Sequence, residues 1–394
     1  MELIEALNRS DKKFSDKNEV PAKFRYRKIS YICFMIMITL FLTINIFTKD
    51  KLYSDSERRY LQQIPKLSIK SLKNGIYSEQ MEKYISDQFI FRNKWVGVKS
   101  LFEYSLGKKM TNGVYFADDN YLIESFSSYD TDKFYKNLRC ISEFTKRNQK
   151  ENININTILV PTASSVLSEK LPENSPECNQ NKMLDYASQI IPGFIDVSKD
   201  LSLHSSEYIY YKNDHHWTSL GAFYAYNSYR KYNQESYRDI NEYVKTILSK
   251  NFYGTTYSRS QFIFNNPDQI TAFDASVDNP ITVTYNFSDI SDSIYELSYI
   301  NTNDQYSVFL NGNQPFTQIE TTNKSGKRLM IIKDSYANTF AQMCIPDYEE
   351  IYLIDLRYFK APIDEYIDKY KVTDILLLYN IKGFADDNNI IFLL

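Results

Sequence analysis

The longest apolar segment of the chain lies near its N-terminus. Residues 29–47 carry no charged side chain, and at about 1.5 Å per residue a helix of this length nearly spans the hydrocarbon core of a bilayer. The preceding flank is basic, with Lys23, Arg25, Arg27 and Lys28. The positive-inside rule therefore predicts a cytoplasmic tail over residues 1–28, an uncleaved single-pass anchor over 29–48 and an extracytoplasmic remainder in the cell envelope.

Beyond the anchor, short apolar runs alternate with amphipathic ones. The apolar runs predict strands over 155–160, 194–197, 329–332, 351–356 and 375–379. The amphipathic runs predict helices over 132–149, 219–232, 336–343 and 364–371. Apolar strands of this kind are covered on both faces, so the order predicts an α/β fold, in which a parallel sheet lies in a three-layer α/β/α domain.

Three regions depart from this alternation. Residues 77–106 have helical spacing, and residues 112–123 form a predicted hairpin that turns at 118–120. The stretch at about 253–318 is polar and aromatic, with strand-like pieces such as 281–285. It predicts an insertion that walls a binding groove. The chain beyond the anchor therefore divides into a stalk and helical segment over 49–110 and an α/β domain over 111–394, which contains the insertion.

Composition narrows the possible functions. The 394 residues include 46 Lys and Arg against 49 Asp and Glu, and this balance argues against a protein that binds nucleic acid nonspecifically. The absence of a Cys-x-x-Cys motif excludes a zinc ribbon. Cys140 and Cys178 are possible disulfide partners, with Cys344 left over. No cofactor or metal is expected, and Asp214 with its two neighbouring histidines is the only plausible metal-binding cluster.

The first candidate for catalysis is the segment Asp214-His215-His216-Trp217-Thr218, which holds two of the three histidines. In an extended chain Asp214 and His216 point the same way, so the carboxylate would orient the imidazole as in a nucleophilic triad. Thr218 is the predicted N-cap of the helix that follows. Trp217 is either a platform for a sugar ring or a packing anchor, and packing is favoured.

The second candidate is Ser335, in the segment Lys333-Asp334-Ser335-Tyr336-Ala337-Asn338. A buried strand leads directly into this serine, which opens a helix, as in serine hydrolases. Backbone N–H groups at Ser335 and Tyr336 would stabilise the oxyanion that forms when the serine attacks an ester. The alternative is that Ser335 only caps the helix.

These two segments, in this order, resemble the DHHW family, which is SGNH-hydrolase-like and related to the AlgJ and AlgX type of alginate O-acetylation proteins. Further matching pieces are Ser56 to Leu61, Asp87 to Arg92, Asn112 to Tyr115 and Val160 to Thr162. The resemblance implies an SGNH-like fold with permuted motif order. It also implies that Ser335 is the nucleophile, His216 the base and Asp214 its orienter.

The same resemblance suggests further site residues. Ordinary SGNH enzymes complete the oxyanion hole with a glycine and an asparagine, and here Asn380 matches the asparagine, whereas Arg357 or Tyr358 stands where the glycine would be. With Trp217 and His215, Arg357 and Tyr358 are candidate substrate contacts. His204 is expected to be structural or exposed.

The implied function is that of a membrane-anchored O-acetyltransferase that acts on a cell-surface polysaccharide beside a membrane-bound O-acyltransferase, which donates acetyl groups. Two alternatives remain open: a carbohydrate acetylesterase with the same triad, and a noncatalytic polysaccharide-binding or scaffold protein of an acetylation complex.

Overall fold

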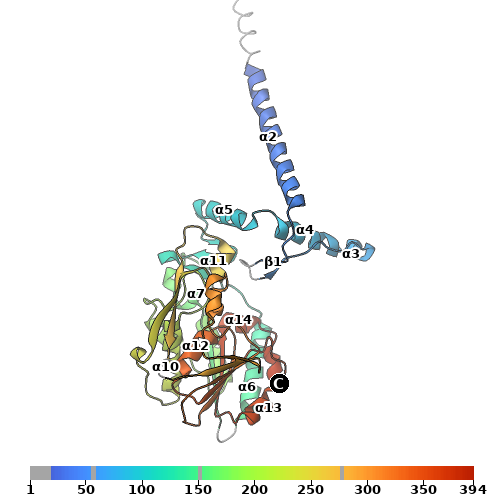
Figure 1. Cartoon of the computed structure of the whole chain (residues 1–394). Coiled ribbons are helices and arrows are strands. Elements are labelled where there is room, and N and C mark those ends of the chain that lie inside the picture. Colours follow the sequence, from blue (N-terminus) through green and yellow to red (C-terminus); the bar gives the residue numbers. More distant parts are fainter. Residues whose placement is uncertain (1–18, 55–58, 150–152, 276–278) are drawn as a thin grey trace, which may run out of the picture. The chain divides into compact units, whose positions relative to one another are not determined.

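The computed structural model describes residues 19–54, 59–149, 153–275 and 279–394 (Figure 1). The described residues form two compact units. The first unit comprises residues 19–54 and 59–95, and the second comprises residues from 96 onward. Residues 1–18 of the predicted cytoplasmic tail and residues 56–58 of the matching piece Ser56 to Leu61 lie outside the described residues.

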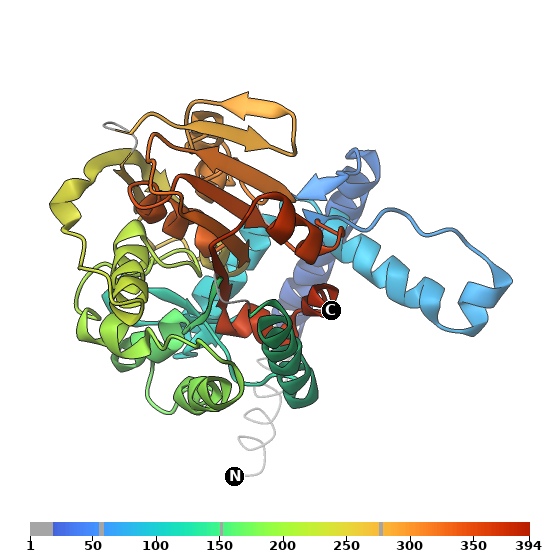
Figure 2. The ribbon, with the colours of Figure 1, turned by 90° about the horizontal axis from the view of Figure 1, so that it is seen from below.

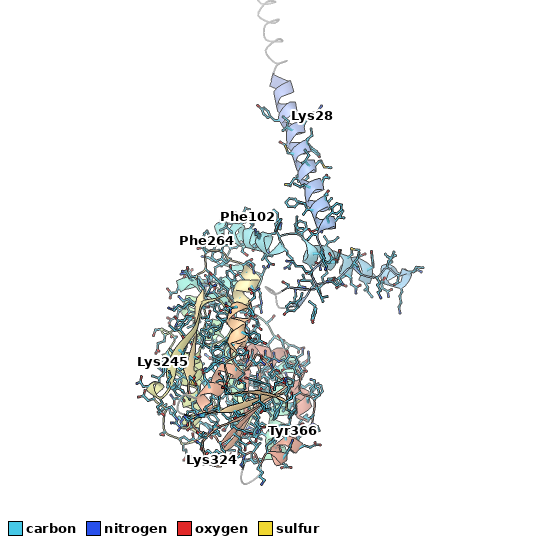
Figure 3. All side chains as sticks on the ribbon, viewed as in Figure 1. Lys28, Phe102, Lys245, Phe264, Lys324 and Tyr366 are labelled. Carbon is cyan, nitrogen blue, oxygen red and sulfur yellow. The ribbon has the colours of Figure 1, made fainter. Side chains whose placement is uncertain are left out.

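The first unit begins with the predicted apolar helix. Helix α2 (Glu19–Phe47) contains a segment, Tyr26–Phe47, that is long and apolar enough to cross a membrane. The most apolar part of this segment is not buried, and Lys28 lies near its start (Figure 3). Such a helix is either an anchor or a signal sequence, because both pass the same test of length and composition.

Short elements follow α2 in the first unit: β1 (Tyr53–Ser54), β2 (Arg59–Tyr60), α3 (Ile69–Lys73) and α4 (Ile76–Gln88). Arg59 and Asp87, from two of the matching pieces, form an ion pair, with Arg59 Nη1 2.8 Å from Asp87 Oδ2. The backbone N–H of Gln62 donates to the same oxygen over 2.8 Å. The bond to Arg59 holds the pKa of Asp87 below its ordinary value.

A seven-stranded mixed sheet forms the centre of the second unit. Its order is β10-β9-β11-β13-β12-β14-β6. The parallel part contains β13 (Glu350–Ile354), β12 (Arg328–Lys333), β14 (Asp374–Asn380) and β6 (Asn154–Val160). The antiparallel part contains β11 (Phe316–Glu320), β9 (Thr282–Tyr285) and β10 (Asp289–Ser291), and the ribbon of β9 and β10 forms one edge (Figure 2).

Helices cover both faces of the sheet, as the apolar strands predict. One face packs against α10 (Ser219–Tyr232) and α12 (Ala337–Cys344), with α7 (Ala163–Val166) and α9 (Ser198–Leu203) alongside. The other face packs against α6 (Thr131–Asn148), α8 (Gln180–Ile190), α13 (Ile363–Lys369) and α14 (Ile381–Asp386). Figure 1 shows α10 and α12 apart from α6 and α13, with strands between them. The predicted three-layer α/β/α fold is confirmed.

Smaller elements complete the second unit. Helix α5 (Arg92–Ser105) begins before the division and ends within this unit. The predicted hairpin is present as β4 (Val114–Phe116) and β5 (Leu122–Glu124), which β3 (Met110–Thr111) extends to three strands. A further antiparallel pair consists of β7 (Val244–Phe252) and β8 (Asp268–Asp274), with α11 (Thr255–Ser260) between them.

The structure corrects one expectation. The strand predicted over 194–197 is wrong: this extended segment makes a single parallel bridge, between Phe194 and Thr157 of β6, and then turns into α9. The stretch 253–318 contributes β9, β10 and the start of β11 to the sheet. All four cysteines are free, so Cys140 and Cys178 form no disulfide in this structure.

Candidate active site

Ser335 lies where the parallel strand β12 ends. The strand is buried because Leu329 to Ile332 are apolar, and Asp334 continues the pairing, with its N–H donating to Leu378 O over 3.2 Å. The chain then turns at Ser335 and enters α12 at Ala337. Ser335 is half-buried and lies at the carboxyl edge of the sheet, where sites in α/β proteins gather.

The histidine segment forms a tight loop between two paired residues, Tyr210 and Trp217. Buried Asp268 at the start of β8 holds this loop, since it accepts the backbone N–H of Lys212 over 3.1 Å and that of Asn213 over 2.6 Å. Thr218 then caps α10 as predicted: its side chain accepts the N–H of Gly221.

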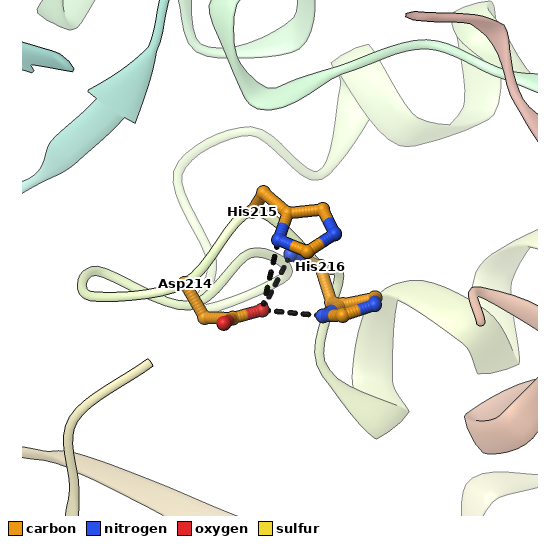
Figure 4. Close-up of side chains that lie close together, drawn as sticks. All are labelled: Asp214, His215 and His216. Carbon is orange, nitrogen blue, oxygen red and sulfur yellow. Dashed lines mark hydrogen bonds and ion pairs between the residues drawn. The ribbon is translucent and has the colours of Figure 1, made fainter. Parts of the chain in front are cut away.

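The structure brings Asp214, His216 and Ser335 into one hydrogen-bonded chain. Ser335 Oγ is 2.7 Å from His216 Nε2, and His216 Nδ1 bonds to Asp214 Oδ1. Asp214 Oδ1 also accepts the backbone N–H of His216 over 3.0 Å. Figure 4 shows the carboxylate directed at the two imidazoles. Because Nδ1 faces the carboxylate, it carries the proton, and Nε2 is left to accept the serine hydroxyl.

Residues from the 253–318 stretch hold the other oxygen of the carboxylate. Asp214 Oδ2 accepts the Thr255 N–H over 2.7 Å and the Thr255 hydroxyl over 3.0 Å. Gly254 lies so close that a Cβ atom there would come within 2.3 Å of the Asp214 side chain. Asp214 is therefore buried, both of its carboxylate oxygens take part in hydrogen bonds, and the backbone of α11 fixes its orientation.

An aromatic side chain from the same stretch stacks on the imidazole. Tyr306, in the 3-10 helix Gln305–Val308, lies with its ring 3.8 Å from that of His216 at an interplanar angle of 8°. Thr255 and Tyr306 were not predicted from the sequence. Both residues act through tertiary contacts with a loop far away in the chain, and the only sequence signal was that their stretch was expected to lie near the groove.

The three groups expected to stabilise the oxyanion are the Ser335 N–H, the Tyr336 N–H and the Asn380 side chain, and they differ in the hydrogen bonds that they make. In the part of the chain that the structure describes, the Ser335 N–H donates no hydrogen bond. The Tyr336 N–H donates to Asp334 Oδ1 over 2.9 Å, so it is already occupied. Asn380 caps α14, since its Oδ1 accepts the N–H groups of Lys382 and Gly383, while its Nδ2 lies 3.5 Å from Val160 O.

The four candidate substrate contacts have distinct environments. Trp217 is completely buried and donates to Tyr336 O over 2.9 Å, so it packs behind the serine turn and has no surface for a sugar. His215 is half-buried and lies 2.6 Å from Thr255 Oγ1. Arg357 pairs with buried Asp355 over 2.8 Å, and Tyr358 is exposed at the same edge of the sheet.

His204 takes no part in this site. Its ring stacks on Tyr224 at 3.5 Å, and its Nδ1 is 2.6 Å from Glu207 Oε1. Asp214, His215 and His216 have potential metal-ligand atoms within 4.8 Å of one another. The atoms of Asp214 and His216 are, however, engaged with each other, with Thr255 and with Ser335.

Buried charges surround the serine turn. Burial lowers the pKa of Lys333 to about 8, and its Nζ donates to Asn338 Oδ1 over 2.7 Å. Burial raises the pKa of Asp334, whose Oδ2 accepts the Asn380 N–H over 2.7 Å and so connects the ends of β12 and β14. The lysine and aspartate of the motif therefore shape the turn that presents Ser335.

A second charged group lies beside His215. Burial alone would raise the pKa of Glu124, but His215, Arg259 and Lys382 outweigh burial and hold that pKa at about 2. Glu124 Oε1 is 2.8 Å from Lys382 Nζ and 2.5 Å from Arg259 Nη1. Glu124 is therefore an ionised structural carboxylate next to the histidine loop.

Comparisons with solved structures show the same fold elsewhere. A DHHW family protein from Eubacterium siraeum is 26% identical, with a TM-score of 0.63 over 72% of this chain and 95% of that chain. PatB1 from Bacillus cereus, solved alone and with a sulfonyl adduct, is 19% and 17% identical. Both structures give a TM-score of 0.58. The structure of PatB1 alone covers 70% of this chain and 97% of its own, and the sulfonyl adduct covers 71% and 98%.

A search of curated protein sequences found no significant match. The structural likenesses confirm the predicted SGNH-hydrolase-like fold. The model of the DHHW protein family matches residues 103–354, more than half of the chain, and this range includes both the histidine loop and the serine turn. The chain therefore belongs to the DHHW family.

Proposed function

We propose that this protein is an O-acetyltransferase that modifies a cell-surface polysaccharide through a Ser335–His216–Asp214 triad. The observation that carries the proposal is the hydrogen-bonded chain from Asp214 through His216 to the half-buried Ser335 hydroxyl, with 2.7 Å between Nε2 and Oγ. A serine that only capped α12 would need no such base, because its hydroxyl would bond to the helix backbone.

The chemistry follows from this geometry. His216 Nε2 takes the proton as Ser335 Oγ attacks the acetyl carbonyl of an ester donor, and the imidazolium then protonates the departing alcohol. A sugar hydroxyl attacks the resulting acetyl-serine and gives its proton to His216, which returns it to Ser335 Oγ. Asp214 keeps Nδ1 protonated and stabilises the imidazolium in both halves.

The oxyanion that forms in each half needs donors aimed at it. The Ser335 N–H is the first donor in this proposal because no group in the described chain uses it. The Asn380 side chain would be the second, after a rotation that breaks its contact with Val160 O and its cap on α14. Tyr336 would contribute its N–H only if Asp334 released it.

The cellular setting is part of the same proposal. The Tyr26–Phe47 segment would anchor the protein in the cell membrane, with the N-terminus in the cytoplasm and the catalytic unit outside. The family resemblance suggests that a membrane-bound O-acyltransferase supplies acetyl groups. Such a partner would work in the same membrane and would deliver the acetyl donor on the side where the catalytic unit lies.

An acetylesterase would use the same residues with water as the acceptor, so the site geometry alone does not separate it from a transferase. A noncatalytic scaffold would retain the fold without needing His216 and Ser335 in contact, and their 2.7 Å separation argues against it.

The test uses purified full-length protein in detergent micelles. Release of chromophore from p-nitrophenyl acetate is followed with and without a short oligosaccharide acceptor, for wild type, Ser335→Ala and the remote control His204→Gln. Serine-dependent turnover that yields acetylated oligosaccharide supports the transferase, and serine-dependent turnover to free acetate alone supports the esterase. Equal rates for wild type and Ser335→Ala would refute the triad and favour the scaffold.

A further inference from the structure

Tyr306 contacts both the base and the serine of the triad. Its ring stacks nearly parallel on the His216 imidazole, with centroids 3.8 Å apart and an interplanar angle of 8°. Its hydroxyl donates to the backbone carbonyl of Ser335 over 3.1 Å. One side chain therefore connects the two residues between which a proton would move.

The surroundings of Tyr306 hold the ring in place. Tyr211 and Phe309 pack on it edge-on or tilted, with centroids 6.3 and 5.6 Å away. Both belong to the same buried cluster as Phe252. Burial raises the pKa of the Tyr306 phenol well above its ordinary value, so the hydroxyl stays protonated and remains a donor.

The His216 ring has several charged or titratable neighbours. Asp214 and His215 come from its own loop, and the His215 ring lies 3.9 Å from it at an angle of 38°. From the serine turn, Ser335 lies at Nε2 and the Tyr336 ring lies 5.2 Å away. From the 253–318 stretch, Tyr306 supplies the stacked face, and an aromatic face attracts a cation.

We propose that Tyr306 is a positioning residue that keeps the His216 imidazole aligned with Ser335 and stabilises its protonated form through the aromatic face. This inference rests on the proposed function and deepens it: the stretch 253–318 supplies part of the machinery that holds the base. Neither the ring nor the hydroxyl of Tyr306 needs to touch the acetyl group for this role.

The test separates the ring from the hydroxyl in the full-length protein. Tyr306→Phe keeps the stacked ring, and we expect kcat with p-nitrophenyl acetate to stay within about fivefold of wild type, because only the neutral hydrogen bonds to Ser335 O and Thr339 Oγ1 are lost. Tyr306→Leu removes the ring, and kcat should fall on the order of a hundredfold, with KM little changed, because a misaligned base slows chemistry rather than binding.

The pH profile distinguishes this role from a structural one. The Tyr306 ring favours the protonated form of His216. In Tyr306→Leu, the acid limb of the plot of kcat against pH should therefore have its midpoint about half a pH unit lower than in wild type. Pentafluorophenylalanine at position 306 provides a second measurement that does not depend on Tyr306→Leu folding. It keeps the shape but reverses the ring charge distribution, so it should shift the limb in the same direction relative to Tyr306→Phe.

Tyr299→Leu is the matched control, because Tyr299 packs at the border of the same cluster; we expect its activity and acid limb to match wild type. An unchanged acid limb in the pentafluorophenylalanine variant, or a Tyr306→Leu enzyme with wild-type kcat, would overturn the inference. If Ser335→Ala retains full activity, the proposed function itself has failed, whereas loss in Ser335→Ala with no effect at position 306 rejects only the role of Tyr306.

Discussion

At the scale of single residues, the site depends on the placement of one proton. His216 Nδ1 faces a carboxylate that takes part in four hydrogen bonds, and this arrangement leaves Nε2 free to accept the Ser335 hydroxyl. The two adjacent histidines are therefore not equivalent. His216 lies between Asp214 and Ser335, whereas His215 bonds to Thr255 Oγ1 and remains partly accessible.

Asp214→Asn should expose this dependence. Thr255 donates two hydrogen bonds to one oxygen of Asp214, so the asparagine amide would turn its NH2 group toward His216 and favour the wrong tautomer. We expect kcat to fall about ten-thousandfold with little change in KM. Steady-state kinetics with p-nitrophenyl acetate measures this, with His204→Gln as the control, and a loss smaller than tenfold would contradict the assigned role.

Lys333 offers a prediction about stability. Burial lowers its folded-state pKa from the ordinary 10.5 to about 8. Between these pH values the unfolded chain binds more protons than the folded one, so this lysine makes the free energy of unfolding rise with pH. Lys333→Met should lack that rise, and chemical denaturation of both proteins from pH 8 to pH 10 measures it. If the free energy of unfolding changes with pH in the same way in both proteins, Lys333 does not carry a shifted pKa in the folded state.

At the scale of elements, the site draws on three separate segments. The turn after β12 presents Ser335, the loop before α10 presents Asp214 and His216, and the start of α11 fixes the carboxylate. The first two were predictable, because a buried strand followed by a helix and an Asp-x-His spacing leave local patterns in the sequence. The role of α11 was not, because its contacts form only in the folded chain.

The difference between local sequence patterns and tertiary contacts also explains which parts of the fold could be predicted. The four strands of the parallel part and the four helices predicted around them are present, with boundaries shifted by at most a few residues. These elements carry apolar runs or amphipathic spacing of their own. By contrast, β11 gains its place through antiparallel pairing with β9 and β13, and residues 194–197 are mostly apolar yet make only one bridge.

Substitutions at Thr255 test the contribution of α11. Thr255→Val removes the hydroxyl that donates to Asp214 and lies 2.6 Å from His215 Nδ1, while the N–H remains. Because a hydrogen bond to a charged group is worth about 1.5–3 kcal/mol, we expect kcat to fall tenfold or more. Thr255→Ser keeps the hydroxyl and serves as the matched variant. Equal rates for the two variants would show that the hydroxyl is dispensable.

At the scale of the whole molecule, the chain combines one helix suited to a membrane with a DHHW-family α/β unit. The proposed reaction needs both parts, since an acceptor at the cell surface and a donor in the membrane meet only outside the cytoplasm. The near balance of acidic and basic residues gives the molecule no strong general attraction to polyanions. Selection of the polysaccharide would therefore depend on the site rather than on net charge.

The anchor can be tested by fractionation of cells that express the full chain. We expect the protein to stay in the membrane pellet after alkaline carbonate washing, with external protease digesting the catalytic unit. Ile36→Lys combined with Leu40→Lys should abolish membrane retention, because each central charge opposes insertion by about 2.5–3.5 kcal/mol. A mature N-terminus beyond Phe47 would instead identify a cleaved signal sequence and contradict the anchor.

Mass spectrometric mapping of the acyl-enzyme shows whether Ser335 is a nucleophile activated by His216. Full-length wild type, Ser335→Ala and His216→Ala are mixed with p-nitrophenyl acetate, quenched in acid within the first turnover and digested. We predict acetylation of the wild-type peptide that carries Ser335 and none at that peptide in either variant. If wild type turns over the ester while Ser335 stays unmodified, Ser335 is not the nucleophile. If Ser335 is acetylated equally in His216→Ala, His216 does not activate it.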